Sequence, residues 1–249
     1  MTATPSILKN CKFYLDGYDF SGSSNALSLT REVDEVECTV WGDAAHRFMP
    51  GLEHVKFEHQ GYASSDGTSD QEDIMYAKLS TASVPMMVCP TTGAVNTQAH
   101  FCPQMQSKYQ WGGTVGEMNA FTVSGVGQGQ PLILGRIMMT GAKTSTTTGT
   151  AYELGAVTAA TNYLYAQLHV FAQSGTSPTL DVIVESDDAE GFSSAATRIT
   201  FAQIAGASVP TAVWATPVAG AITDTWWRVK ATLGGVNPSF TFAIAVGIR

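Results

Sequence analysis

The sequence predicts a mainly β protein with two β-sandwich domains, the first of which carries one helix. Three observations support this fold class. Stretches of alternating apolar and polar residues recur along the chain, and Gly, Ser, Asn and Pro residues separate them as turns. Only one segment carries the start signals of a longer helix. The chain has 249 residues, enough to bury the cores of two domains of ordinary size.

The first clear strands lie between residues 35 and 60. Two stretches alternate between apolar and polar residues, and their apolar members are Val36, Cys38, Val40, Val55 and Phe57. Each stretch is expected to bury one face. Between them, Asp43 is a candidate N-cap for a short helical turn over 44–48, which Pro50 then ends.

The one longer helix is predicted at about 69–79. Ser69 and Glu72 have the spacing of a capping box, in which each side chain accepts a hydrogen bond from the other residue's backbone N–H. Asp70 and Asp73 add negative charge to the first turn, where the helix dipole favours it. Strand patterns return after this helix.

The segment 141–150 is small, polar and nearly featureless, so it is predicted to be a linker. It separates a domain at 1–140, which holds the helix, from a second sandwich at 151–249. The core-facing rows expected in the second domain are Leu164, Ala166, Leu168 and Val170, followed by Leu180, Val182 and Val184. The last strand, SFTFAIAVGIR, has large apolar residues at one parity and Thr, Ala and Gly at the other. The face that carries these small residues is expected to lie close to another sheet or to a neighbouring molecule.

Composition narrows the classes of function. Charged residues make up only 14% of the chain, which suits a protein that covers much of its surface with neighbours. The net charge of −8 disfavours wrapping around nucleic acid. Passage of DNA through a negatively charged channel without tight binding is compatible with this charge.

The chain start carries no apolar leader, and no apolar run is long enough to span a bilayer, so synthesis in a cytoplasm and no membrane partner are expected. The cysteines have no CxxC spacing, and free, mostly buried thiols are expected. They are Cys11, Cys38, Cys89 and Cys102.

The histidines give no convincing metal or catalytic site. His54 and His59 have opposite parity on one strand, so they are expected to point to opposite faces, and with His46 they are interpreted as surface or turn residues. His169 shares a parity with Tyr163 and is expected to be packed rather than catalytic. The chain has no GxSxG serine elbow, and SGVGQGQ lacks the GK[ST] ending of a phosphate loop.

The acidic stretch TLDVIVESDDAEGF allows three interpretations. Glu185 and Asp187 share a strand face, a spacing compatible with a carboxylate pair in a polysaccharide depolymerase. The acids also resemble part of a calcium loop, but the regular spacing and following helix of an EF-hand are missing. The favoured interpretation is a solvated turn at the end of a strand, after which Phe192 returns to the core.

Several aromatic residues in the second half could form a platform for sugar: Tyr163, Tyr165, Trp214, Trp226 and Trp227. Because Trp226 and Trp227 are adjacent, one is expected to face outward and the other to pack inside. A core Trp and a Trp at a subunit contact are favoured over sugar binding.

Most of the chain resembles a family of tailed-phage virion proteins, the tail-tube-like or major tail proteins. The matching features are a D-G-Y-D-hydrophobic-S turn at 16–21, a VD-x-V strand at 33–36, T-x-x-G-D at 39–43, the basic Arg47, and P-G-L at 50–52. The segments YQWGGTVGEMNAFTVSG, SGTSPTLDVIVESDDAEGF and SFTFAIAVGIR also resemble such proteins. Simple tail-tube proteins often have one β domain, so the second sandwich is a departure from the family pattern.

The resemblance implies a structural virion protein that is assembled in the host cytoplasm and makes β-rich contacts with its own copies and with other virion proteins. A tail tube subunit would form a ring, expected to be a hexamer. The alternatives are a capsid decoration protein, for which a trimer is an option, and a carbohydrate-binding module on the virion surface. The sequence predicts no enzyme activity and no catalytic, cofactor-binding or metal-binding residues.

Overall fold

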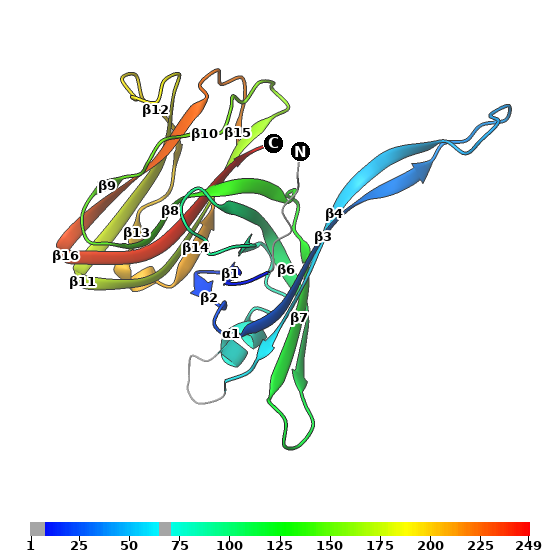
Figure 1. Ribbon diagram of the computed structural model, residues 1–249, viewed down its shortest axis with the longest axis horizontal. Helices are drawn as coiled ribbons and strands as arrows, with labels where there is room; N and C mark the ends of the chain where they lie inside the picture. The colour runs from blue at the N-terminus through cyan, green and yellow to red at the C-terminus, as the bar shows by residue number, and fades with distance from the viewer. Residues whose placement is uncertain (1–7, 65–70) are drawn as a thin grey trace. The chain divides into compact units, whose positions relative to one another are not determined.

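The computed structural model describes residues 8–64 and 71–249 (Figure 1). Within these residues the fold is mainly β with one α-helix, as the sequence predicts. The strands are β1 Lys12–Leu15, β2 Tyr18–Asp19, β3 Ser24–Glu37, β4 Phe48–Tyr62, β5 Val84–Cys89, β6 Gln98–Gly112, β7 Ala120–Gly127, β8 Ile133–Lys143, β9 Thr147–Thr148, β10 Tyr152–Glu153, β11 Tyr163–Asp187, β12 Ala196–Thr200, β13 Ile204–Ala205, β14 Thr211–Trp214, β15 Val218–Ala219 and β16 Trp226–Ile248. The helix is α1, Gln71–Ala77, and a short 3-10 helix covers Gly206–Ser208. The predicted cap Ser69 and the predicted first-turn acid Asp70 lie outside the described residues.

The chain divides into two compact units. The first unit comprises Met1–Gly22, Pro85–Cys102 and Ile133–Arg249, and the second comprises Ser23–Val84 and Pro103–Leu132. These units do not follow the boundary predicted at 141–150. That segment contains the end of β8 and all of β9, both of which pair with β16, so it is part of a sheet of the first unit.

The first unit is organised around the long antiparallel pair β11–β16, whose register runs from Leu164↔Ile248 to Asp187↔Trp226 (Figure 1). Both predicted core rows of β11 are buried, which confirms them. In β16, Phe240 and Phe242 face one core cluster, while Ala243 and Ala245 face another that contains Phe101 and Tyr165. The small-residue face of the last strand therefore does lie against other elements, because its short side chains allow a close approach.

The DGYDFS motif forms the tight β1–β2 hairpin of the first unit. Asp16 and Gly17 have φ values of 49° and 83°, the left-handed conformation that such a turn requires. A Cβ on Gly17 would lie 2.3 Å from the backbone N of Thr211, so the turn also approaches β14 closely. Asp19 accepts hydrogen bonds from the backbone N of Ser21 and, at 3.4 Å, from Lys12.

The second unit is built on four antiparallel strands in the order β3–β4–β7–β6. The alternation of β4 predicted from sequence is confirmed: Val55 and Phe57 are buried, and Lys56 and Glu58 are exposed. Helix α1 belongs to this unit and contributes the buried Met75, whose carbonyl accepts a hydrogen bond of 2.7 Å from Gln106.

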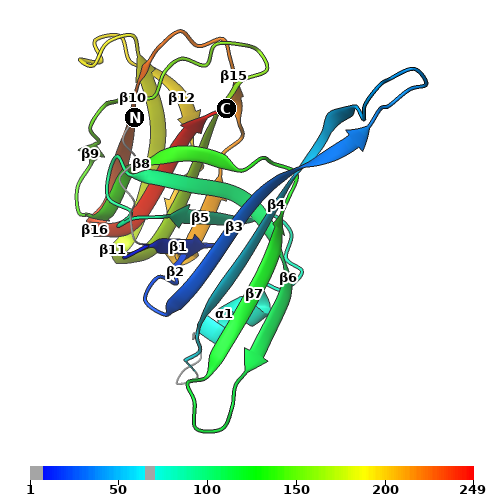
Figure 2. The ribbon, with the colours of Figure 1, turned by 45° about the vertical axis from the view of Figure 1, so that its right-hand side comes forward.

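The β3–β4 hairpin extends well beyond β7, whose pairing with β4 ends at Lys56↔Val126 (Figures 1 and 2). We call residues 32–53 of this hairpin the arm. Two sequence predictions fail here. Residues 44–48 form bends and the start of β4, not a helical turn. Val36 and Val40 are exposed, because the described residues place no second layer against the arm.

Candidate functional site

Of the acidic residues at the end of β11, Glu185 and Asp187 are buried, whereas Asp188 and Glu190 lie in an exposed turn, as the sequence predicts. Asp187 is 1% exposed and accepts hydrogen bonds from the backbone N of Ala189 and of Ser194, at 3.1 and 2.8 Å. Burial favours a higher pKa for Asp187, but these hydrogen bonds outweigh it and lower the pKa below its ordinary value. Phe192 returns to the core after this turn, as predicted.

Two ion pairs neutralise the carboxylates around this turn. Glu185 binds the Arg228 guanidinium at 2.7 Å, and Arg228 also lies 4.1 Å from the centroid of the Phe192 ring. Asp224 accepts hydrogen bonds from Ser186 and Arg198 at 2.6 and 2.8 Å, which lowers its pKa. Glu185 is thus paired with an arginine, and Asp187 is hydrogen-bonded to backbone N–H groups. These two carboxylates are therefore not available as the catalytic pair of a depolymerase.

No group of three or more His, Cys, Asp or Glu residues within the described chain has an arrangement that would hold a metal ion. The calcium interpretation of the acidic stretch therefore has no set of ligands among these residues. The four cysteines are all free thiols, with Cys89 and Cys102 buried.

The histidines are separated and engaged elsewhere. His46 contacts Glu37 at 2.7 Å in the arm. His59 was interpreted as a surface residue, but it is fully buried, lies 2.6 Å from the Ser24 hydroxyl, and has a pKa that burial lowers to about 4. Its burial reflects its parity with Phe57 on the inner face of β4.

His169 is buried, as the sequence predicts, and it holds the β1–β2 turn. The backbone N–H of Gly17 donates to its Nδ1 at 3.3 Å, and its Nε2 lies 3.0 Å from the side-chain amide of Gln167. Because Nδ1 accepts, Nε2 carries the proton of the neutral ring. Burial lowers the pKa of His169 to about 3, so the ring is neutral.

Two of the five aromatic residues considered for a sugar platform, Tyr165 and Trp227, are buried. Trp227 is fully buried and donates a hydrogen bond of 2.8 Å to the carbonyl of Gly155, whereas the adjacent Trp226 is partly exposed, as predicted. Trp214 packs against Phe101 and Tyr165, with ring centroids 5.8 Å apart in each case. These contacts support the core interpretation of the tryptophans.

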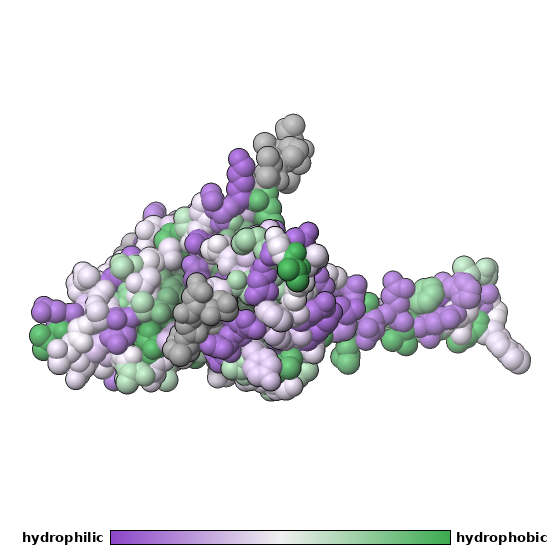
Figure 3. Space-filling view, turned by 90° about the horizontal axis from the view of Figure 1, so that it is seen from below, coloured by the Kyte–Doolittle hydropathy of each residue, from purple (hydrophilic) through white to green (hydrophobic). Residues whose placement is uncertain are grey.

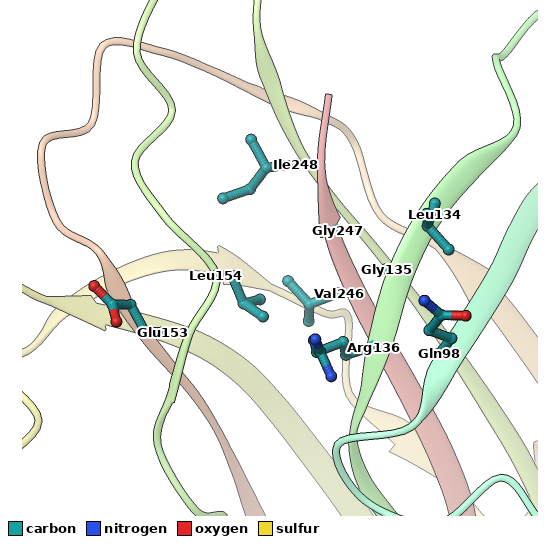
Figure 4. A pocket seen from close by; sticks show the side chains of 9 residues that line it. All are labelled: Gln98, Leu134, Gly135, Arg136, Glu153, Leu154, Val246, Gly247 and Ile248. Atoms are coloured by element: carbon teal, nitrogen blue, oxygen red, sulfur yellow. The ribbon is translucent and has the colours of Figure 1, made fainter. Parts of the chain in front are cut away.

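A hollow of about 270 Å³ lies at one end of β8 and β16 in the first unit (Figure 4). Its lining includes Arg136, Glu153 and the apolar Leu154. Arg136 donates to the carbonyl and side-chain oxygens of Asn96, at 2.8 and 3.1 Å, so its guanidinium is already engaged. Figure 4 shows no nucleophile beside an acid or base among the lining side chains.

The arm is the most unusual surface of the described chain. Seven large apolar side chains on it are exposed: Val33, Val36, Val40, Trp41, Phe48, Met49 and Leu52. Trp41 is fully exposed at 104%, and apolar and hydrophilic groups intermingle along the projecting hairpin in Figure 3. A shallow notch of about 300 Å³ is lined by both faces of the ribbon, with Asp34 and Glu35 beside Phe48 and Met49.

The arm also concentrates the charge of the chain. Its acidic residues are Glu32, Asp34, Glu35, Glu37, Asp43 and Glu53, and its one Lys or Arg is Arg47. Six acids and one base give −5, out of −8 for the whole chain. This concentration of acidic residues is visible in the sequence, but the apolar alternation in the same stretch predicts a buried strand face. The arm is therefore the candidate functional site, and its exposed apolar side chains suit contact with another molecule better than catalysis.

No protein-family model matches the chain, and no curated protein matches it. Parts of it are similar to chains in three solved structures. A chain of the virion of native gene transfer agent (GTA) particle has 11% identity and a TM-score of 0.42, over 51% of this chain and 98% of that one. A chain of the anti-feeding prophage cap (AFP tube terminating cap) has 11% identity and a TM-score of 0.43, over 55% of this chain and 94% of that one.

The third structure is the PVC sheath-tube complex of an extracellular contractile injection system in its extended state. One of its chains has 8% identity and a TM-score of 0.42, over 53% of this chain and 92% of that one. No helix in the described part of the chain is both long and apolar enough to cross a membrane.

Proposed function

We propose that this chain is a structural protein of a tailed-phage virion that assembles with its own copies, as a subunit of the tail tube. The observation that carries the proposal is the arm. An isolated two-stranded hairpin is marginal in water, and this one exposes apolar side chains without a core of its own among the described residues. Such a ribbon is stable when a neighbouring molecule covers it.

The edge of the same sheet supports lateral assembly. Among the described residues strand β3 pairs only with β4, so one side of its middle part, 26–30, presents N–H and C=O groups to no other strand. Register shifts at Ser24/Ala26 and Val33/Glu35, together with the charges of the arm, disfavour pairing with a strand of another molecule at both ends of this edge. The stretch 26–30, ALSLT, has neither a register shift nor a charged residue, and it is the proposed pairing segment.

Strand directions suit a closed ring. Neighbouring strands in β3–β4–β7–β6 are antiparallel, so the two outer strands run in opposite directions. Copies related by rotation about an axis along the strands would continue the antiparallel pairing from one sheet to the next. A hexamer is the ring that we propose.

The outer face of this sheet suits a channel through which DNA passes without being bound tightly. On β4 the exposed residues of one parity are Lys56, Glu58 and Gln60, and β6 adds the exposed Lys108 and Gln110. This face is polar, carries charges of both signs and has no basic cluster that would bind phosphates strongly.

Electron microscopy of the purified protein at increasing concentration tests the proposal. We expect ordered rings or tubes with a central lumen. A folded protein that stays monomeric at high concentration, with no ring, tube or shell, would refute the proposal. The edge is tested separately by Ser28→Lys, which places a charge in the pairing segment and is expected to prevent ring formation. Thr200→Lys, on the exposed part of β12 in the first unit, is the matched control.

A capsid decoration protein is the second candidate, favoured by the extensive core of the first unit, which is more than a ring-forming sheet alone requires. Virion images decide between the two, because a decoration protein would be located on the head and would form trimers rather than a tube.

A further inference from the structure

Two glutamine side chains are buried on the inner face of the sheet in the second unit. Gln104 and Gln106 have the same parity on β6, so they share a face of the strand, and both are fully buried. Glutamine is seldom fully buried, because its amide gives up hydrogen bonds to water and the interior has to supply others. The partners of these two amides therefore have to be accounted for atom by atom.

The protein supplies only one of the hydrogen bonds that the two amides need. Nε2 of Gln106 donates to the carbonyl of Met75 in α1 at 2.7 Å, which fixes the orientation of this amide because a carbonyl can only accept. Among the described residues, Oε1 of Gln106 has no hydrogen-bond partner, and neither Oε1 nor Nε2 of Gln104 has one. Because both ends of the Gln104 amide lack a partner, exchanging its N and O would leave the account unchanged.

Glycines on β7 leave space for these amides. The β7 partners of Gln104 and Gln106 are Gly127 and Gly125, which have no side chains. A Cβ on Gly125 would lie 2.6 Å from Oε1 of Gln104 and 2.1 Å from the ring of Phe57. The Gln104 amide therefore leans along the sheet to the residue that pairs with Gln106. The unpartnered polar atoms belong to two amides that share one buried part of the sheet.

Water is the ligand whose chemistry fits these atoms. Two of them are carbonyl oxygens that accept, and the third is an NH2 group that donates. A water molecule can both donate and accept, and a buried water typically makes about three hydrogen bonds to polar groups of this kind. An ion fits less well, because neither amide carries a charge that would compensate for bringing an ion into the interior.

We propose that Gln104 and Gln106 bind ordered water inside the second unit, and that this water joins the two amides by accepting from or donating to Gln104 and donating to Oε1 of Gln106. Gln106 also attaches α1 to the sheet. Its Nε2 binds the carbonyl of Met75, and its backbone carbonyl accepts from the backbone N of Ser80 at 3.1 Å. The bound water would thus hold the residue that anchors α1. This site does not depend on the assembly proposed above.

A crystal structure of the full chain, at a resolution that shows ordered water, tests the site directly. We expect a water peak within about 2.7–3.2 Å of Oε1 of Gln106 and of one amide atom of Gln104. Absence of this peak would overturn the proposal. Protein groups that pair with all three amide atoms in the crystal would overturn it as well.

The variant Gln104→Met gives an independent test through the sign of the stability change. Met has about the length of Gln but no amide. If water joins the two amides, the variant removes the bridge to Oε1 of Gln106, and the equilibrium constant of unfolding should rise roughly tenfold, measured in urea. If no water is bound, the variant removes two buried groups without partners and should be more stable than the unaltered protein. That outcome would contradict the proposal.

Gln110→Met is the matched control for this measurement. Gln110 lies on the same strand but is exposed, so its amide is hydrated in the folded and in the unfolded chain. The control should change the equilibrium constant of unfolding by less than about threefold. A control that loses as much stability as Gln104→Met would mean that the loss comes from placing Met on β6, and this would remove the support for bound water.

Discussion

His169 shows how one buried side chain ties the N-terminal hairpin to the long strand β11. Its Nδ1 accepts the hydrogen bond of the Gly17 N–H, 152 positions away in sequence, and it does so only while the ring is neutral. Tyr14 and Phe171 enclose the ring, with centroids at 5.9 and 6.3 Å from it. Protonation would place an unpaired charge in this apolar surrounding and remove the acceptor.

The stability of the protein is therefore expected to fall in acid. An unfolded His has a pKa of about 6.5, and burial lowers that of His169 to about 3 in the folded protein. The stabilisation is complete above the unfolded value and is lost as pH falls from there toward the folded value. Between pH 7 and pH 4.5 the free energy of unfolding should drop by about 2 kcal/mol from this residue alone.

Urea unfolding at both pH values measures the drop, and His169→Gln should reduce it because Gln does not titrate. His59, with a pKa near 4, contributes in the same direction and stays in place in both proteins. Equal pH dependence in the variant and the unaltered protein would contradict the role of His169.

Gly17 is expected to tolerate no side chain. Its φ of 83° strains any other residue, and an added Cβ would lie 2.3 Å from the Thr211 backbone. Gly17→Ala should lower the free energy of unfolding by more than about 2 kcal/mol. Gly22→Ala is the control, because nothing lies within 4 Å of its Cβ position, and it should cost less than about 1 kcal/mol. Denaturant unfolding compares the two, and similar losses would contradict the close approach.

At the scale of elements, the β3–β4 hairpin divides into a part that is packed and a part that is not. Val55 and Phe57 are buried where β4 pairs with both β3 and β7. Beyond that point the arm is held by its own ladder, by surface ion pairs such as Arg31–Glu53 at 2.9 Å, and by one hydrogen bond of 3.2 Å from the Leu132 backbone N to Glu53. Surface pairs of this kind add little stability.

Removal of the distal arm should therefore leave the fold intact and prevent the proposed assembly. The variant replaces residues 34–52 by Asn-Gly, which forms a tight turn between Val33 and its partner Glu53. We expect a melting temperature within about 2 °C of the unaltered protein, measured by calorimetry, together with loss of ordered particles in micrographs. A large fall in melting temperature would mean that the arm supports the core of the chain.

At the scale of the whole molecule, segments distant in sequence build each compact unit. Strand β8 pairs with β16 from Val246 to Phe240, and Met138 and Met139 belong to the core cluster around β11 and β16. The region 151–249 alone lacks these contacts. We expect a fragment of 151–249 to lack cooperative unfolding and dispersed amide signals in NMR spectra.

A fragment of 133–249, which restores β8 and β9, should be better ordered than 151–249. Full cooperative folding of 151–249 without β8 would contradict this expectation and would support the domain boundary predicted from sequence.

The sequence predicted the parts of the fold that depend on local pattern. The burial of Leu180, Val182 and Val184, the small residues on one face of β16, and one inward and one outward Trp at 226–227 all follow from a period of two. The pattern also led to the exclusion of a serine elbow and a phosphate loop, since both need fixed local spacing. Such features lie within a few neighbouring residues and need no knowledge of the partner strands.

The tertiary structure decided the rest, because alternation says which residues share a face but not what covers that face. The apolar alternation of 36–40 looks like that of Val55 and Phe57, yet it is exposed, since β4 is the one described strand that reaches it. Glu185 and Asp187, at the end of β11, are buried because Arg228 of β16 and two backbone N–H groups of the following turn meet them there. Sequence determined a mainly β chain with one helix; only the pairing of distant strands decided which of its apolar rows form the core and which one, on the arm, stays exposed.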